Sequence, residues 1–447
     1  MSSKSPMKKR ILILGAGLVS KPGVRYLLDD KDLVVTVASR TVSKAEELVK
    51  GFANGRARQV NVENAAEVEK LIKENDIVVS LLPWVHHLKV ADLCIRHGKD
   101  MATTSYVSEG MKKLDRPARE KGLLFLNEIG VDPGIDHMSA MKIIDEVHRQ
   151  GGKVLHFYSY CGGLPAPHHN DNPFGYKFSW SPKGVVLASR NAAKYLENGQ
   201  VVEIEGKNLF LNNRVEEIED LGTFEVYPNR DSLPYKDLYG LKEAETVMRG
   251  TYRNPGWCDT LKKIVDLGLV DETPSTDLKG KTYKQMMAGL LGVPENSDVV
   301  SGAAEKLGIK KDSQIMDRLV WLGLFSDEKL PEFDNRLDIL SQRMQEKLYY
   351  KEGEQDMLLM RHKFIIENPD KSRYQITSTM IDYGIPGGDS SMARTVSLPL
   401  AIGVKMMAYG QIKLTGVQTA TEKEIYEPVL PELERLDIKL TEKKTPL

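Results

Sequence analysis

A glycine-rich turn near the start of the chain has the residue types and the spacing of a phosphate-binding loop. In order, its residues are Gly15, Ala16, Gly17, Leu18, Val19 and Ser20. Glycine at the first and third places permits a tight turn and a close backbone approach to a pyrophosphate, and the following helix N-terminus offers free N–H groups. Ser20 replaces the third glycine of the usual pattern and is still small. The turn predicts a dinucleotide bound at residues 15–19, and the alternative is an ordinary strand–helix turn.

The end of the second predicted strand indicates which dinucleotide is bound. NAD-binding folds usually place an acidic residue there to hold the ribose 2′-hydroxyl, whereas this chain has Ser39, Arg40 and Thr41. Two hydroxyls and a guanidinium suit a 2′-phosphate, which a carboxylate would repel. We therefore predict NADP(H), and Ser39 and Thr41 also suit the cap of the next helix. Further cofactor contacts are expected from Leu82, Pro83 and Val131.

The composition limits the classes of function. The 447 residues include 62 Lys and Arg against 63 Asp and Glu, which gives a formal net charge of -1. This balance argues against a broad basic surface for nucleic acid or a membrane. No apolar run is long enough for a membrane span, and the stretch at 11–14 is too short for a secretory signal. Cys94, Cys161 and Cys258 form no CxxC pair, so a reducing, cytoplasmic setting is expected.

The first 130 residues alternate short apolar strands with helical segments. This alternation predicts a parallel sheet covered on both faces, a doubly wound sheet of Rossmann type. The expected strands are 10–14, 33–38, 57–62, 76–82, 99–103 and 123–127, and the expected helices are 20–29, 42–50, 64–75, 86–97 and 108–121.

The pattern changes after residue 132. A helix is expected from Pro133-Gly134 to Val147, and the strand-like runs that follow predict a mixed sheet. These runs are 154–160, 223–227, 357–366 and 374–381. Residues 241 to about 350 have helical spacing and predict an insertion. Ser390 and Ser391 are expected to cap a last long helix, which Pro399 should kink or break.

Together these patterns predict an α/β protein of three domains. The first is a Rossmann-like NADP-binding domain of residues 1–132 and 388–447. The second is a mixed α/β domain of residues 133–240 and 355–387. The third is a mostly helical inserted domain of residues 241–354.

Several longer segments are specific enough to indicate one family. They are 105–108, 127–137, 159–167, 171–181, 227–232, 249–251 and 321–327. In this order they resemble the saccharopine reductases, also called saccharopine dehydrogenases (NADP, L-glutamate-forming). The resemblance runs from about residue 10 to the C-terminal helix.

The resemblance implies an enzyme of lysine metabolism that joins 2-aminoadipate 6-semialdehyde and L-glutamate through an imine. NADPH then reduces the C=N bond to give saccharopine, and the reaction is reversible. The resemblance also implies that the second, central domain binds substrate and forms a homodimer through its sheet. The charge balance predicts no nucleic acid or membrane partner.

Saccharopine carries three carboxylates, so its site needs cationic donors. Arg230 lies in a turn favoured by Asn229 and Asp231, which would aim its guanidinium at a carboxylate. Gly250, which Arg249 and Thr251 flank, is expected to allow a close backbone approach. The resemblance implies that Ser105, Tyr106, Arg230 and Thr251 contact the substrate. Asp132 and Arg249 complete the predicted substrate-binding residues. For each arginine the alternative is a solvated surface residue.

Imine formation requires proton transfers, because a carbinolamine must lose water. The resemblance makes Asp132, Cys161 and Tyr106 the candidates. Asp132 lies at a strand–helix junction, and its alternative role is a helix N-cap. Cys161 is followed by Gly162-Gly163, which suggests an open backbone near the thiol, and its alternative is a buried apolar residue. Tyr106 has the alternative of an ordinary half-buried tyrosine.

Other sites and functions fit less well. His86-His87 and His168-His169 lack the spacing and carboxylate partners of a metal site, so none is expected. One other hypothesis is a related imine-reducing enzyme such as carboxynorspermidine synthase. Another is a non-catalytic nucleotide-binding scaffold, because a fold alone does not fix function. The scaffold hypothesis predicts the loss of Asp132, Cys161, Arg230 and Arg249, all of which are present.

Overall fold

The computed structural model describes residues 8–447, so the first seven residues of the predicted NADP-binding domain lie outside the described residues. The chain forms two compact units that divide within strand β14 (Arg373–Tyr383). Unit 1 contains the chain up to Gly152 together with Met380–Glu442, and unit 2 contains Lys153–Thr379 and Lys443–Leu447.

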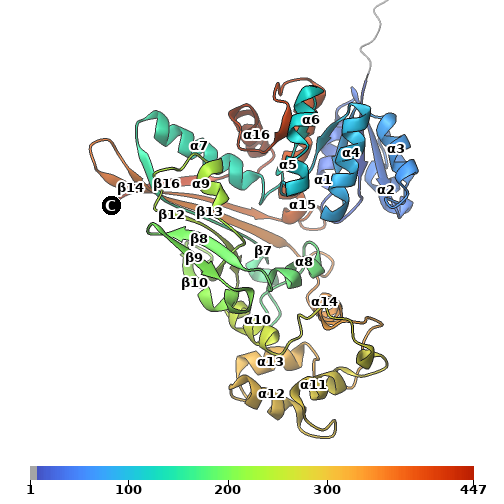
Figure 1. Ribbon diagram of the computed structural model, residues 1–447, viewed down its shortest axis with the longest axis vertical. Helices are drawn as coiled ribbons and strands as arrows, with labels where there is room; N and C mark the ends of the chain where they lie inside the picture. The colour runs from blue at the N-terminus through green and yellow to red at the C-terminus, as the bar shows by residue number, and fades with distance from the viewer. Residues whose placement is uncertain (1–7) are drawn as a thin grey trace, which may run out of the picture. The chain divides into compact units, whose positions relative to one another are not determined.

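Unit 1 is built on a seven-stranded sheet whose order is β15-β6-β5-β4-β1-β2-β3. Figure 1 labels several helices of this unit, among them α1 to α6. Its strands are β1 (Lys9–Leu14), β2 (Leu33–Ser39), β3 (Gly55–Gln59), β4 (Ile77–Ser80), β5 (Asp100–Ala102), β6 (Leu124–Leu126) and β15 (Gly416–Gln418). Every neighbouring pair is parallel. The six strands predicted before residue 130 are therefore confirmed, because continuous apolar runs such as Ile11–Leu14 are buried on both faces.

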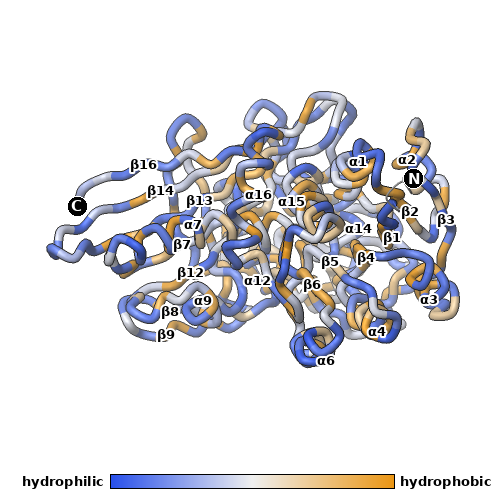
Figure 2. The backbone as a smooth tube through the Cα atoms, turned by 90° about the horizontal axis from the view of Figure 1, so that it is seen from above, coloured by the Kyte–Doolittle hydropathy of each residue, from blue (hydrophilic) through white to orange (hydrophobic). Residues whose placement is uncertain are grey.

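The helices of unit 1 pack in two groups, α1 with α2 and α15, and α3 with α4, as a doubly wound sheet requires. The helices are α1 (Lys21–Asp29), α2 (Val42–Val49), α3 (Ala65–Lys73), α4 (His87–His97), α5 (Glu109–Lys112), α6 (Asp115–Glu120), α7 (Ile135–Arg149), α15 (Ser391–Ala408) and α16 (Lys423–Arg435). Ser390 caps α15 as predicted, since its Oγ accepts from the Ala393 N–H at 3.1 Å. The helix continues through Pro399 without a break. It is buried along nearly its whole length, and Figure 2 colours much of it as hydrophobic, so packing holds it together.

Unit 2 is built on a mixed sheet whose main order is β10-β11-β12-β7-β13-β14-β16, with β8 joined to β12 and to β9. Its strands are β7 (Lys153–Pro165), β8 (Ala193–Glu197), β9 (Gln200–Ile204), β10 (Arg214–Ile218), β11 (Gly222–Pro228), β12 (Thr246–Arg253), β13 (Asp356–Glu367), β14 and β16 (Thr441–Pro446). The β12–β7 pair is parallel, whereas β7–β13 and β11–β12 are antiparallel. The predicted mixed sheet is confirmed.

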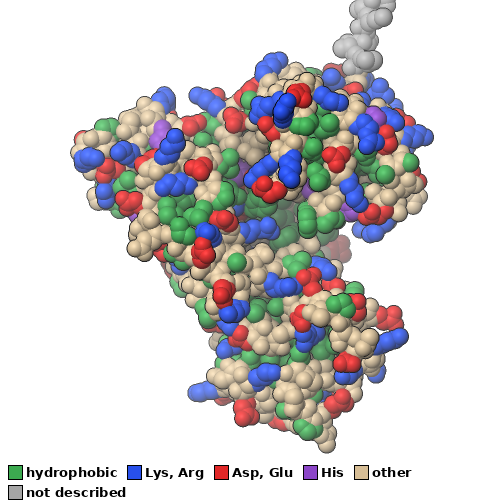
Figure 3. Space-filling view, in the orientation of Figure 1, with side chains coloured by type: hydrophobic (Ala, Val, Ile, Leu, Met, Phe, Trp, Pro, Cys, Tyr) green, Lys and Arg blue, Asp and Glu red, His purple; other side chains and the backbone are tan. Residues whose placement is uncertain are grey.

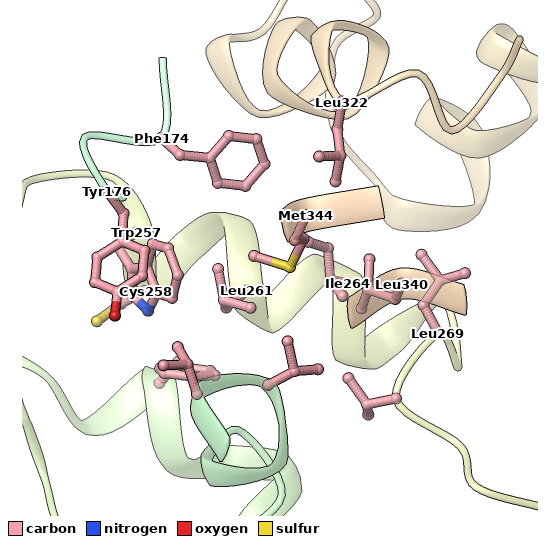
Figure 4. Close-up of a cluster of buried hydrophobic side chains, with 14 of the residues drawn as sticks. Phe174, Tyr176, Trp257, Cys258, Leu261, Ile264, Leu269, Leu322, Leu340 and Met344 are labelled. Atoms are coloured by element: carbon pink, nitrogen blue, oxygen red, sulfur yellow. The ribbon is translucent and has the colours of Figure 1, made fainter. Parts of the chain in front are cut away.

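Helical segments of unit 2 pack against this sheet around one large apolar core. They are α8 (Pro182–Ala188), α9 (Pro234–Leu238), α10 (Trp257–Asp266), α11 (Tyr283–Leu291), α12 (Val299–Leu307), α13 (Gln314–Trp321) and α14 (Arg336–Lys347). Figure 4 shows Phe174 and Tyr176 beside Trp257 and Leu261 of α10, with Met344 of α14 on the same core. The region predicted as a helical insertion is helical and shares this core with the sheet. The boundaries between three domains stay a prediction.

Candidate functional site

The glycine loop between β1 and α1 has the backbone geometry that its sequence predicts. Gly15 has a φ of 116°, and a Cβ there would lie 2.8 Å from the Leu81 carbonyl oxygen. Its N–H donates to the Ala38 carbonyl at 2.9 Å, which ties the loop to the end of β2. At Gly17 a Cβ would meet no atom within 4 Å. The first glycine is therefore needed by the fold, and the second leaves open space where a phosphate is expected.

Ser20 does not replace the third glycine in its packing role. Its hydroxyl donates to the Gly17 carbonyl at 2.7 Å, so it closes the loop on itself. The close helix contact falls instead at Gly23, where a Cβ would lie 2.5 Å from the Ser397 carbonyl oxygen of α15. The Gly23 N–H also donates to Ser397 Oγ at 2.9 Å. Close packing of α1 therefore depends on a glycine three residues beyond the usual pattern.

A cleft of about 340 Å³ lies along the carboxyl ends of β1, β2 and β4. Most of the residues predicted to bind the cofactor line it: Gly15, Ala16, Gly17, Ser39, Arg40, Thr41, Leu82 and Pro83. Leu18, Val19 and Val131 do not line the cleft, and their contact with a cofactor stays a prediction. The cleft also contains Lys44 and Asn61, which the sequence analysis missed. Lys44 follows Arg40 by four residues at the start of α2, and that spacing is the signal for a second cation.

The cationic end of this cleft is available to an anion. Within residues 8–447, neither Arg40 nor Lys44 forms an ion pair. Thr41 occupies the N-cap position of α2, yet its side chain makes no capping hydrogen bond. Ser39 Oγ accepts from the Thr41 N–H at 3.3 Å. Two cations and a hydroxyl therefore face a cleft whose strand end carries no carboxylate, the arrangement expected for a 2′-phosphate.

Three predicted substrate residues come together after β5 and β6. Tyr106 Oη donates to Asp132 Oδ1 at 3.1 Å, and Ser105 precedes Tyr106 in the same loop. The N-cap of α7 is Gly134, so Asp132 does not occupy the capping position that was its alternative. Tyr106 and Asp132 are both half-buried. The hydroxyl and the carboxylate can therefore exchange a proton with each other and with a bound ligand.

Glu128 holds this loop in place. Its φ is 54°, its Oε1 accepts from the Val107 N–H at 2.8 Å, and its own N–H donates to the Ser105 carbonyl at 3.2 Å. Its Oε2 lies 2.7 Å from Nε2 of the buried His137. A buried carboxylate in a left-handed conformation is costly unless several partners hold it. The backbone of Ser105, Tyr106 and Val107 is thus fixed from one side by a single residue.

In unit 2, Cys161 of β7 and Thr251 of β12 are direct neighbours in a parallel register. Cys161 is buried. The expectation of an open backbone beside its thiol is wrong, because a Cβ at Gly162 would lie 2.6 Å from the Tyr252 carbonyl oxygen. Gly250 likewise serves packing, since its Cβ position is filled by Val226 and Tyr160. These glycines let the strands and side chains of the sheet approach each other.

The two predicted arginines have different surroundings. Arg249 is buried, its Nη1 donates to Tyr235 Oη at 2.7 Å, and its guanidinium carbon lies 4.3 Å from the centre of the Tyr235 ring. Arg230 is exposed in the turn after β11, with a φ of 56°, and its carbonyl accepts from the Lys194 N–H. The guanidinium of Arg230 is therefore the more accessible to a ligand.

Arg253 is a further cation that the sequence analysis missed. It follows Thr251 by two residues on β12, so both side chains lie on one face of the sheet. It is only 4% exposed, and its guanidinium lies 4.8 Å from the ring of Tyr176 and 5.4 Å from that of Trp257. Nη1 donates to the Tyr252 carbonyl, Nε has no hydrogen-bond partner, and no carboxylate of the described residues pairs with it. A buried charge without a counter-ion is unusual and indicates an anionic ligand.

The remaining sequence expectations concern metals and membranes. Residues 8–447 contain no group of three His, Cys, Asp or Glu side chains placed to hold a metal ion. No helix in that range is long and apolar enough to span a bilayer. On the face seen in Figure 3, acidic and basic side chains are interspersed.

Comparisons with known families and proteins agree on one assignment. Residues 11–126 match the family described as "Saccharopine dehydrogenase NADP binding domain", and residues 130–438 match "Saccharopine dehydrogenase C-terminal domain". The chain is 40% identical, over 97% of its length and 98% of the relative's, to the saccharopine dehydrogenase [NADP(+), L-glutamate-forming] of Schizosaccharomyces pombe. It is 38% identical to the mitochondrial alpha-aminoadipic semialdehyde synthase of Bos taurus, with 98% of this chain matching 48% of that protein.

Two solved structures resemble this chain along nearly its whole length. Apo saccharopine dehydrogenase (L-Glu forming) from Saccharomyces cerevisiae matches 98% of this chain and 100% of its own, with a TM-score of 0.90 and 40% identity. A homospermidine synthase from Legionella pneumophila, described in complex with NAD, matches with a TM-score of 0.59 at 11% identity, with 99% of this chain and 93% of that chain covered, which shows a shared fold.

Proposed function

The chain belongs to the saccharopine dehydrogenase family, and on this premise we propose that it is an NADP(H)-dependent oxidoreductase of lysine biosynthesis. It joins 2-aminoadipate 6-semialdehyde and L-glutamate through an imine and reduces that imine to saccharopine, in a reversible reaction. The observation that carries this proposal is about 40% identity over nearly the full length of curated fungal enzymes of that activity.

The cleft beside β1 and β2 fits NADP(H). A phosphate fits the open side of Gly17 at the N-terminus of α1. Arg40 and Lys44 give the 2′-phosphate two cations, because the carboxylate that lines the same cleft, Glu63, lies near His86 and Lys89 instead. When bound, the nicotinamide of NADPH supplies the hydride, and the protein contributes placement.

Candidate substrate-binding residues occur in each of the two units. We assign carboxylate binding to the guanidinium groups of Arg230 and Arg253, because one is accessible and the other is buried without a counter-ion. Ser105 and Thr251 offer hydroxyls for further hydrogen bonds. Arg249 remains a predicted substrate residue, and its bond to Tyr235 fixes the direction of its guanidinium.

The acid and base of imine formation are assigned to Asp132, Tyr106 and Cys161. Loss of water from the carbinolamine requires a proton on the departing hydroxyl, and the Tyr106–Asp132 hydrogen bond gives that proton a path. In the opposite direction the same carboxylate accepts a proton from the attacking water. Cys161 lies beside Thr251 in the sheet and is the third candidate.

We further propose a cytoplasmic homodimer formed through the sheet of unit 2, as the family resemblance implies. Light scattering after size-exclusion chromatography tests the assembly, because a dimer has twice the 50.2 kDa mass of the chain. A monomer at micromolar concentration would contradict it.

Turnover tests the proposed reaction directly. NADPH oxidation is followed with the semialdehyde plus L-glutamate, and then with the semialdehyde plus other amines, including a diamine. Oxidation is expected with glutamate. Turnover with the diamine alone would favour a carboxynorspermidine synthase-like enzyme, and NADPH binding without any turnover would favour the scaffold hypothesis.

A further inference from the structure

A buried histidine joins two serine side chains beside the predicted substrate loop. Ser80 Oγ lies 2.8 Å from His87 Nδ1, and His87 Nε2 lies 2.8 Å from Ser105 Oγ. Ser80 ends β4 and is fully buried, whereas His87 begins α4 and is 6% exposed. Only Ser105, the last member of the series, belongs to the predicted ligand site.

The hydrogen-bond partners of the Ser80 hydroxyl determine which atoms donate and which accept in this series. Within residues 8–447, His87 Nδ1 is the one acceptor that the structure provides for the Ser80 hydroxyl proton. A buried hydroxyl donor left without an acceptor costs free energy, so Ser80 donates to Nδ1. Nδ1 then carries no proton, and the neutral imidazole bears its proton on Nε2.

The proton on Nε2 determines what Ser105 does. Since Nε2–H donates to Ser105 Oγ, an oxygen lone pair of the serine is occupied and its own O–H is left to point elsewhere. The hydroxyl has no other protein partner among the described residues. Burial, and next the charge of the adjacent His86, lower the pKa of His87 to about 4, which keeps the ring neutral near pH 7.

We propose that His87 is a positioning residue that holds the Ser105 hydroxyl as a hydrogen-bond donor toward a substrate carboxylate. The proposal rests on the proposed function for the identity of the ligand, and on the Ser80–His87–Ser105 geometry for the direction of the bonds. In such a series each bond polarises the next, so the Ser105 O–H is a stronger donor than an isolated serine.

Nitrogen-15 NMR of the histidine-labelled whole protein tests the tautomer without substrate. The His87 signals, assigned by their loss in His87→Gln, are expected to show a protonated Nε2 and an unprotonated Nδ1 between pH 6 and 8. A protonated Nδ1 would overturn the proposal. This measurement does not depend on activity, so it separates failure of the proposal from failure of the proposed function.

Substrate binding provides the second test. Ser80→Ala and His87→Gln are each expected to weaken saccharopine binding about threefold to tenfold with NADPH binding unchanged, the size expected for one weakened hydrogen bond. Ser105→Ala should weaken it about tenfold or more, and adding His87→Gln to Ser105→Ala should cause little further loss. An equal further loss would show that His87 acts by another route and would overturn the proposal.

A matched control uses the other end of α4. His97 is bonded to Glu69 on the surface, and His97→Gln is expected to leave saccharopine affinity unchanged. Thermal unfolding of each variant identifies any that fold poorly, and Ser80→Ala, the smallest change, then carries the binding test.

Discussion

At the scale of single residues, we propose that Arg40 and Lys44, which line the cleft, determine which cofactor it accepts. Arg40→Asp places a carboxylate where the 2′-phosphate is expected and removes one of two cations. The NADPH dissociation constant should rise about 10-fold to 100-fold, whereas NADH binding should improve, because a carboxylate holds a 2′-hydroxyl. Fluorescence titration of both cofactors measures the change. Lys50→Asp, at the other end of α2, is the control and should alter neither constant. Unchanged NADPH affinity in Arg40→Asp would show that Arg40 does not face the cofactor.

Arg253 is the buried cation that we propose binds a substrate carboxylate, and the free energy of unfolding of a variant tests that role. Arg253→Met keeps an unbranched, flexible apolar side chain in place of the arginine stem but removes the desolvated charge. The free energy of unfolding should stay the same or rise, by up to about 1–3 kcal/mol, while saccharopine affinity falls about 10-fold to 100-fold. Urea unfolding and calorimetric titration measure the two quantities.

Arg343 provides the contrasting control for that experiment. It is buried to a similar degree but pairs with Glu328 and Glu346. Arg343→Met should lower stability and leave saccharopine affinity unchanged, because this charge has protein partners. A loss of stability in Arg253→Met as large as in Arg343→Met would show that Arg253 is a structural residue.

His87 also makes folding sensitive to acid. Its pKa is about 4 in the folded chain, mainly because of burial and next because of His86, against 6.5 for an ordinary histidine. Between pH 4 and pH 6.5 the histidine is protonated in the unfolded chain but neutral in the folded chain. The free energy of unfolding is therefore highest above pH 6.5 and falls by about 3 kcal/mol in total as the pH falls toward 4. His87→Gln removes this loss. Between pH 7 and pH 4.5, the free energy of unfolding measured in urea should fall by about 2–3 kcal/mol more for the wild type than for the variant. Equal falls would contradict a buried neutral histidine.

At the scale of elements, two glycines at the start of α1 separate packing from cofactor contact. A Cβ at Gly23 meets Ser397 of α15, whereas a Cβ at Gly17 meets nothing. Gly23→Ala should therefore destabilise the protein by about 1–3 kcal/mol, and Gly17→Ala should leave stability nearly unchanged while weakening NADPH binding. Denaturant unfolding and NADPH titration of both variants check this. Equal stability of the two variants would mean that α1 does not need its close contact with α15.

The elements also show what the sequence can and cannot reveal. Strands of the parallel sheet are predictable because runs such as Ile77–Ser80 are buried on both faces. Strand β12 is harder to predict, because Gly250, Arg249 and Arg253 interrupt its apolar pattern. Arg249 lies over the ring of Tyr235 and Arg253 over that of Tyr176, which belong to other segments, and no local periodicity encodes such a contact. Strand β15 has three residues, too few for any pattern.

Some residues of the candidate site are likewise predictable from the sequence, and others are not. The glycine loop and Ser39-Arg40-Thr41 are predictable, because local spacing carries their chemistry. The roles of His87 and Glu128 depend on hydrogen bonds to Ser80, Ser105 and Val107, which only the folded chain brings into place. Arg253 had one usable signal, its alternation with Arg249 and Thr251 along an extended segment.

At the scale of the whole molecule, the two compact units contain different sets of candidate site residues. The residues that line the dinucleotide cleft all belong to unit 1, whereas Cys161, Arg230, Thr251 and Arg253 belong to unit 2. A ligand stabilises the part of a chain that binds it. NADPH and saccharopine should therefore leave distinct patterns of protection along the chain.

Hydrogen exchange with NADPH tests this division. At 100 times its dissociation constant NADPH contributes about 2.7 kcal/mol to the folded state that binds it. Amides of β1, α1 and β2 that exchange by opening of unit 1 should slow by up to about 100-fold, and amides of α11, α12 and α13 should keep their rates. Arg40→Asp at the same NADPH concentration is the control and should lose most of the protection in α1 and β2. Equal slowing of amide exchange in α11–α13 would contradict separate units. It would show that the helices of unit 2 open only together with the parallel sheet of unit 1.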